Sequence, residues 1–319
     1  MDHAQASDAE AGAFGAAGAA TPHAGVPILD LGLMLEAPSP ANAAPQRKAL
    51  DRLAEACADC GTFSVVNHGL PGDVIDSLLS LADEFFALPM AEKARVSRGD
   101  SASARGFRHQ SLPAGLSHDS FLWIEAPEHL RQLPGLDSSL NLWPERPARF
   151  ETVFRASARA LSQLSRRVLQ AIGLSAGLGE DALAFLNELQ SIQLHDYDPG
   201  AELPAHTDMA PLTIIFADAD GLEVKLSSGS WAPVPSTGGV LSCMLGDVAM
   251  RLTNDCYQTA LHRVARQSRR RRSVLWEPGC DPHAPIGPLS SFCSGSESPR
   301  YEKQSFAEIV RQWLAAKQD

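Results

Sequence analysis

Residues 194–208 read L-H-D-Y-D-P-G-A-E-L-P-A-H-T-D, and a further histidine follows in residues 260–264, A-L-H-R-V. His206 and Asp208 are two residues apart, so on an extended strand their side chains leave the same face. His262 stands in a second run that reads as a short strand. Two imidazoles and one carboxylate are the ligand set of the facial triad, which leaves coordination positions open on a ferrous ion. These three residues are therefore the candidate metal ligands and the candidate catalytic centre, although a two-residue pattern such as H-x-D also arises by coincidence.

Arg271 and Ser273 belong to the downstream run R-R-S-V-L-W-E-P, residues 271–278. They are again two residues apart, so a strand presents both to one side. A guanidinium can bind the far carboxylate of a dicarboxylic acid through two parallel hydrogen bonds, and a hydroxyl can add another. The basic run at 269–272 is also typical of a solvated face without a ligand.

Tyr197 follows an apolar alternation and offers a third donor toward the same ligand. An aromatic side chain packed in the core is the competing interpretation. His195 shares the strand face of Tyr197.

The order of these motifs resembles a known family. The chain carries Y, HTD, LT, GLEV, W-x-PV, GD, TN, HRV and R-x-S in sequence between Tyr197 and Ser273. Its N-terminal half adds V-P-I-L-D-L at 26–31, V-V-N-H-G at 65–69 and F-F-A-L-P at 85–89. From about Val26 to the C-terminal helix, the sequence is similar to the isopenicillin N synthase-like, iron(II)- and 2-oxoglutarate-dependent oxygenases.

This resemblance implies an enzyme, a 2-oxoglutarate-dependent dioxygenase. Fe(II), 2-oxoglutarate and O2 would be its cofactor and cosubstrates. It would hydroxylate, desaturate or cyclise a small organic metabolite and release succinate and CO2. The family's R-x-S matches Arg271 and Ser273, so these two residues are expected to bind 2-oxoglutarate. His195 stands where many plant relatives carry Asn, and Trp276-Glu277 stands where paired Phe is usual.

Two alternatives remain open. The family's namesake is an oxidase that needs no 2-oxoglutarate, and in such an enzyme Arg271 and Ser273 would bind a substrate carboxylate. The other alternative is a metal-binding jelly-roll protein without turnover.

The substrate pocket is predicted from long segments of weak periodicity. Residues 99–123 and 280–301 are expected to close over the iron, because long loops on a rigid β scaffold often carry binding residues. Arg105, Phe107 and Arg108 are the candidate substrate contacts in the first segment, and Trp276 is expected to line the floor. An exposed loop without ligand contact explains the first segment equally well.

Composition limits the other functions. The chain has 319 residues and a formal net charge of −11, which disfavours a nucleic-acid partner. It has no apolar run long enough to cross a membrane. The six cysteines lack a disulfide or zinc spacing, and Cys57 and Cys60 are expected to pack on a helix. We expect a cytoplasmic, monomeric protein with a small-molecule substrate.

The expected fold is mixed α and β, dominated by a double-stranded β-helix (jelly-roll) core with flanking N-terminal helices and a C-terminal helix. Residues 1–25 are expected to be a flexible tail and 26–319 a single oxygenase domain. Within it, residues 26–187 are helix-rich, about 188–280 form the jelly roll with the metal site, and 281–319 form a loop and helix. Apolar periodicity predicts helices at 44–58, 73–87 and 150–172, and strands at 28–31 and 62–67. Ser305 and Glu308 have capping-box spacing, which predicts a last helix ending near Lys317.

Overall fold

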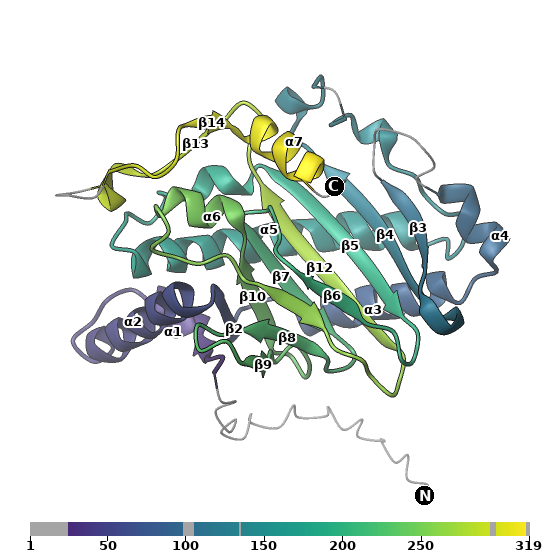
Figure 1. The fold of residues 1–319 in the computed structure, drawn as a ribbon, viewed down its shortest axis with the longest axis horizontal. Coiled ribbons are helices and arrows are strands. Elements are labelled where there is room, and N and C mark those ends of the chain that lie inside the picture. Colours follow the sequence, from purple (N-terminus) through teal and green to yellow (C-terminus); the bar gives the residue numbers. More distant parts are fainter. Residues whose placement is uncertain (1–24, 98–104, 134, 294–297, 317–319) are drawn as a thin grey trace, which may run out of the picture.

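Two β-sheets face one another and carry helices on one outer side (Figure 1). The computed structural model describes residues 25–97, 105–133, 135–293 and 298–316. The flexible tail expected at 1–25 lies outside these ranges except for Gly25, and so does the predicted helix end near Lys317. The jelly-roll prediction is confirmed by the sheets, as is the mixed α and β class.

Among the residues that the structure describes, the large sheet comprises eight strands. In spatial order they are β1 (Ile28–Asp30), β2 (Thr62–Val66), β10 (Leu241–Leu245), β7 (Leu212–Ala217), β12 (Arg271–Gly279), β5 (Leu189–Tyr197), β4 (Ser117–Glu125) and β3 (Gly106–Ser111). The small sheet has four strands in the order β6 (Leu203–His206), β11 (His262–Val264), β8 (Leu222–Lys225) and β9 (Trp231–Pro233). A separate pair joins β13 (Pro285–Ile286) to β14 (Gln304–Ser305).

Strand β12 shows how the alternation of side chains builds the two faces of the large sheet. It pairs with β5 on one side and β7 on the other, with Arg271 opposite Tyr197 and Ser273 opposite His195. Because side chains alternate along a strand, Arg271 and Ser273 face the small sheet, and Val274 and Trp276 face the helices. Val274 and Trp276 are wholly buried in the main core cluster.

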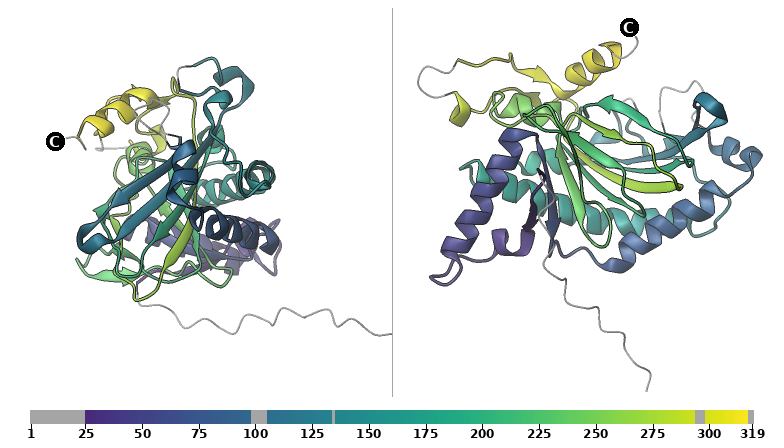
Figure 2. Two further views of the ribbon diagram at one scale, coloured as in Figure 1. Left: turned by 90° about the vertical axis from the view of Figure 1, so that its right-hand side faces the viewer. Right: turned by 60° about the horizontal axis from the view of Figure 1, so that its bottom comes forward.

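The long helices before residue 176 cover the face of the large sheet that points away from the small one, as Figures 1 and 2 show. The longest, α5 (Phe150–Ser175), buries one apolar stripe that includes Leu161, Leu164 and Val168. Each such side chain contributes roughly 1.5–3 kcal/mol through burial. The predicted helix at 150–172 is confirmed, and it extends one turn further than its apolar pattern.

The remaining helices are α1 (Leu31–Leu35), α2 (Ala43–Asp59), α3 (Gly72–Phe86), α4 (Met90–Lys93), α6 (Asp247–Leu252) and α7 (Phe306–Ala316). Short 3-10 turns occur at Ala94–Val96, Pro113–Gly115, Glu128–Leu130, Ser138–Leu140, Ala184–Asn187 and Ser290–Phe292. Helix α7 begins with the predicted capping box: Glu308 N–H donates to the Ser305 hydroxyl, and the Ser305 backbone N–H donates to the Glu308 carboxylate. Within the described ranges, none of the helices combines the length and apolar character needed to cross a membrane.

The prediction of an irregular loop at 99–123 is wrong for the described part of this segment. Of its described part, Gly106–Ser111 and Ser117–Glu125 form the hairpin β3–β4, which extends the large sheet beside β5. Residues 98–104 lie outside the described ranges. The strands were not predicted from the sequence, because the side chains that face the cavity are polar and only those on the opposite face are apolar and buried. Pairing with β5 decides the conformation more strongly than local composition does.

Candidate active site

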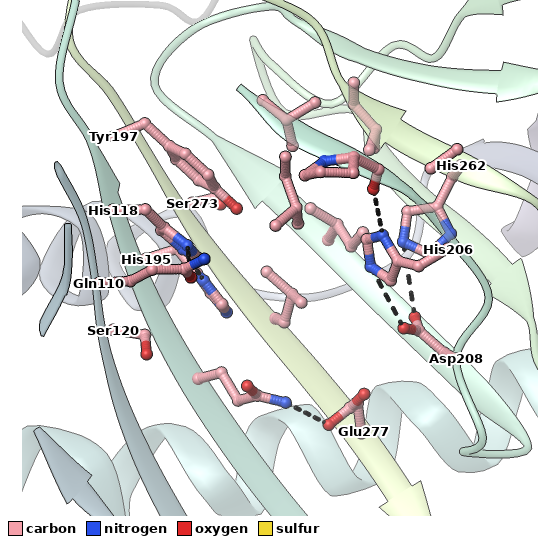
Figure 3. A pocket seen from close by; sticks show the side chains of 18 of the residues that line it. Gln110, His118, Ser120, His195, Tyr197, His206, Asp208, His262, Ser273 and Glu277 are labelled. Carbon is pink, nitrogen blue, oxygen red and sulfur yellow. Dashed lines mark hydrogen bonds and ion pairs between the residues drawn. The ribbon is translucent and has the colours of Figure 1, made fainter. Parts of the chain in front are cut away.

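A cavity of about 550 Å³ lies between the two sheets. Its walls come from β3, β4, β5, β7 and β12 of the large sheet and from β6, β8 and β11 of the small one. Trp313 of α7 adds a further side chain to the lining. Figure 3 shows the polar side chains that point into it. The cavity therefore joins residues that are far apart in the sequence.

Three metal-ligating side chains meet at the small-sheet wall. His206 ends β6, His262 begins β11, and the two residues are direct partners in the antiparallel pair. Asp208 follows two residues after His206, with 3.8 Å from its Oδ1 to His206 Nε2 and 3.8 Å from its Oδ2 to His262 Nε2. One potential ligand atom from each residue lies within 4.8 Å of the others. This set of two imidazoles and one carboxylate suits a ferrous ion with open positions.

The backbone fixes the tautomer of both histidines. His206 Nδ1 lies 2.9 Å from the carbonyl oxygen of Pro204, and His262 Nδ1 lies 2.9 Å from that of Ala260. A carbonyl accepts hydrogen bonds, so each Nδ1 carries the proton and donates. Each Nε2 is then the nitrogen that would bind a metal ion.

Asp208 is oriented by two neighbours. Thr213 donates its hydroxyl to Asp208 Oδ2 at 2.7 Å, and Asp247 donates its backbone N–H to the Asp208 carbonyl at 2.9 Å. Gly246 lies so close to this loop that an added Cβ would stand 2.5 Å from the Asp208 carbonyl oxygen and 2.1 Å from that of Ala210. The LT and GD motifs of the sequence therefore support the loop that carries the carboxylate.

Arg271 lies at the large-sheet wall and is 1% exposed. Its Nη1 donates to the Ser273 hydroxyl at 2.9 Å, and burial lowers the pKa of its guanidinium. Its Nε and Nη2 have no hydrogen-bond partner among the residues that the structure describes. An unsatisfied buried donor is costly, so a carboxylate ligand bound by these atoms would satisfy them. The residues present fit the far carboxylate of 2-oxoglutarate.

The neighbouring arginines point the other way. Arg270 and Arg272 both pair with Asp196, which is 3% exposed, and Arg272 also pairs with Asp83 and Asp218. Only every second side chain of a strand can face the cavity, which separates Arg271 from its neighbours. The interpretation of this run as a solvated basic face is wrong for Arg271.

Tyr197 belongs to a stack of rings beside Arg271. The ring of His118 on β4 lies parallel to that of Tyr197, with centroids 4.2 Å apart, and His118 Nε2 is 2.8 Å from His195 Nδ1. The Arg271 guanidinium lies 5.7 Å from the Tyr197 ring centroid. Burial raises the pKa of Tyr197 to about 12, so its hydroxyl remains a donor, and burial lowers the pKa of His118 to about 4. No local sequence signal points to His118, because its place depends on how β4 pairs with β5.

Among the predicted substrate contacts, Arg108 lines the cavity and three others do not. Arg105 is wholly buried and donates to the carbonyls of Gly135 and Asp137. Phe107 is buried against Phe85 on the helix side of the sheet. Trp276 is also wholly buried there and does not line the floor. These three predictions are wrong because side chains alternate along a strand, and these residues occupy the positions that face away from the cavity.

The expected closure by residues 280–301 is also wrong for the described part of that segment, none of which lines the cavity. Trp313 of α7 does so instead. The polar side chains that were missed are Gln110, His118, Ser120, Gln193 and Glu277. The alternation of β12 and β5 could have identified Glu277 and Gln193, which share the faces of Arg271 and Tyr197. Gln110, His118 and Ser120 depend on the pairing of β3 and β4 with β5, which could not be read from the sequence.

Two parts of the chain match known protein families. Residues 26–146 match the family described as non-haem dioxygenase in morphine synthesis N-terminal, and residues 184–276 match the 2OG-Fe(II) oxygenase superfamily. Homoarginine-6-hydroxylase from Arabidopsis thaliana is 28% identical over 78% of this chain and 82% of its own length. Hyoscyamine 6-dioxygenase from Hyoscyamus niger is 29% identical, covering 85% of this chain and 83% of that protein.

A solved structure has the same fold. A full-length Neurospora crassa protein, crystallised in complex with alpha-KG, superposes with a TM-score of 0.78 at 19% identity. The match covers 91% of this chain and 96% of that one.

Proposed function

Because this chain belongs to the 2OG-Fe(II) oxygenase superfamily and is an iron(II)- and 2-oxoglutarate-dependent oxygenase, we propose that His206, Asp208 and His262 hold its iron. The convergence of these three side chains at one wall of the cavity carries the proposal. Both imidazoles direct Nε2 to the same point, and the carboxylate is oriented by Thr213.

Arg271 and Ser273 bind the far carboxylate of 2-oxoglutarate in this proposal. The two guanidinium nitrogens without a described partner supply the planar fork, and Ser273 holds the third nitrogen in place. Tyr197 adds a hydroxyl whose raised pKa keeps it protonated. The guanidinium and the phenol therefore present donors to an anionic ligand in a site sheltered from water, where charge-assisted hydrogen bonds are strong.

Bound iron and 2-oxoglutarate together supply the oxidising chemistry, with release of succinate and CO2. The chain itself positions the substrate and limits the access of water to the cavity. Apolar side chains on both sheets, including Ile215, Leu222 and Val264, line the cavity beside the proposed ligands. Hydroxylation of a C–H bond in a small organic molecule is the reaction that we propose. Relatives are named for different substrates, homoarginine and hyoscyamine among them, so the names alone do not select one.

We further propose that residues 26–319 act as one oxygenase domain, in the cytoplasm and as a monomer, without a nucleic-acid partner. The long helices before residue 176 pack against the same sheet whose other face carries the cavity, which supports the proposal of a single domain. The net charge of −11 supports the last.

An anaerobic titration tests the proposed ligands. Wild-type protein with Fe(II) and 2-oxoglutarate should develop a metal-to-ligand charge-transfer band in the visible range, and Asp208→Ala should not. Circular dichroism should stay the same, because the ligands occupy a preformed cavity. An unchanged band in Asp208→Ala would overturn the assignment. Oxygen uptake with and without 2-oxoglutarate then separates this activity from that of a cosubstrate-free oxidase, which would consume oxygen in both cases.

A further inference from the structure

Glu277 carries a carboxylate into the cavity from the same strand as Arg271. Arg271, Ser273, Leu275 and Glu277 follow one another on the cavity face of β12. At about 3.3 Å per residue, roughly 20 Å of strand separates the backbone of Arg271 from that of Glu277. The wall thus carries a basic residue at one end, where the cosubstrate is proposed to bind, and an acidic residue at the other.

Two side chains of the neighbouring strand orient this carboxylate. Gln193 donates its Nε2 hydrogen to Glu277 Oε2 at 2.5 Å, and Ser191 donates its hydroxyl to the same oxygen at 3.2 Å. Ser191 is the direct partner of Glu277 in the β5–β12 pair. Figure 3 shows the Glu277 carboxylate on the cavity side of β12 together with its hydrogen-bonded neighbour. The side chain is therefore held in position by the sheet.

Trp313 lines the same cavity from α7 and is half-buried. An indole ring attracts a cation to its face, and tryptophan does so more strongly than the other aromatic residues. An ionised carboxylate accepts hydrogen bonds and donates none. The Glu277 carboxylate thus favours a positively charged donor, and Trp313 adds an aromatic ring to the lining of the same cavity.

We infer that the Glu277 end of the cavity binds a positively charged group of the substrate, either a protonated amine or a guanidinium. This inference rests on the proposed function, because it takes the cavity to be the substrate pocket of an oxygenase. A hydrogen bond in which both partners are charged is stronger than one in which a neutral donor meets the carboxylate. The cationic substrate should therefore bind about ten- to a hundredfold more tightly than its neutral isostere.

Calorimetry with matched probes tests the inference. The protein is loaded anaerobically with Fe(II) and 2-oxoglutarate and titrated with phenethylamine, phenethylguanidine, 2-phenylethanol and phenylacetate. These probes share a phenyl ring and differ in charge. In the wild type, one or both cations should bind at least about tenfold more tightly than the alcohol, and phenylacetate should bind most weakly.

Two variants test whether Glu277 causes the preference for cationic probes. Glu277→Gln keeps the size of the side chain and removes its charge, so it should abolish the preference for cations. Glu180→Gln removes an exposed carboxylate outside the cavity and should retain it. The wild-type comparison needs no variant, so equal binding of the amine and the alcohol would overturn the inference even if Glu277→Gln fails to fold.

Equal binding of the alcohol and the amine by the wild type would overturn the inference. So would an undiminished preference in folded Glu277→Gln, or no cation binding at millimolar concentration. The charge-transfer band and succinate formation of the wild type are recorded separately. Their absence would overturn the proposed function, whereas their presence without cation preference would overturn this inference alone.

Discussion

The hydroxyl of Thr213 donates to Asp208 Oδ2 at 2.7 Å, so a residue on β7 of the large sheet orients a proposed metal ligand near the small sheet. Thr213 is wholly buried, and valine has nearly the same shape. Thr213→Val should therefore preserve the fold and weaken Fe(II) binding about ten- to a hundredfold, the usual effect of losing a partner of a metal ligand. Anaerobic titration measures the affinity.

Thr213→Ser is the matched control, because it keeps the hydroxyl and loses a methyl group. It should bind Fe(II) nearly as tightly as the wild type. If valine and serine weakened binding equally, packing around Thr213 would be responsible and the hydrogen bond would not.

Arg271→Lys tests the cosubstrate site. Lysine keeps a positive charge but lacks the planar fork, so the KM for 2-oxoglutarate should rise about ten- to a hundredfold. Succinate formation at varied 2-oxoglutarate concentration gives this value. Arg270→Lys and Arg272→Lys should change stability more than KM, since both arginines pair with Asp196 on the other face of the sheet. A larger KM effect at either position would contradict the register of β12.

His118 predicts a pH dependence of stability. Burial lowers its pKa from the ordinary 6.5 to about 4 in the folded protein. Between these values the unfolded chain binds more protons than the folded one, so stability falls as the pH falls from about 6.5 toward 4. The loss from this group amounts to at most roughly 3 kcal/mol.

His118→Phe keeps a ring against Tyr197 and removes the titration. Its free energy of unfolding should consequently change less between pH 6.5 and 4 than that of the wild type. Urea unfolding at several pH values measures this slope. The variant also loses the hydrogen bond to His195, so its absolute stability at neutral pH should fall. Identical slopes would mean that other groups dominate this pH range.

Most of the fold could be predicted from the sequence, because the spacing of apolar residues along a helix or strand determines which of its faces is buried. The stripe of α5 and the capping box of α7 both appear where their spacing puts them. The spacing of two also placed Arg271 and Ser273 on one face of β12. The same rule, applied consistently, would have excluded Trp276, which differs from Arg271 by an odd number of positions.

Other parts of the cavity depend on contacts that no local pattern encodes. His118 contacts Tyr197 because β4 pairs with β5. The sequence around β4 carries no strong signal of this pairing. Trp313 lines the cavity because α7 docks beside it. A helical pattern predicts α7 but does not say which neighbour its tryptophan meets.

Trp276→Ala separates the core role of this residue from the substrate role first expected for it. The indole is wholly buried between the sheet and the helices, so its removal leaves a cavity in the main core. The free energy of unfolding should fall by about 3–5 kcal/mol, as measured by urea titration. Leu275→Ala, one position away but facing the active-site cavity, should cost less because Leu275 is only half-buried. A Trp276→Ala protein of wild-type stability with altered probe binding would instead place the indole at the substrate.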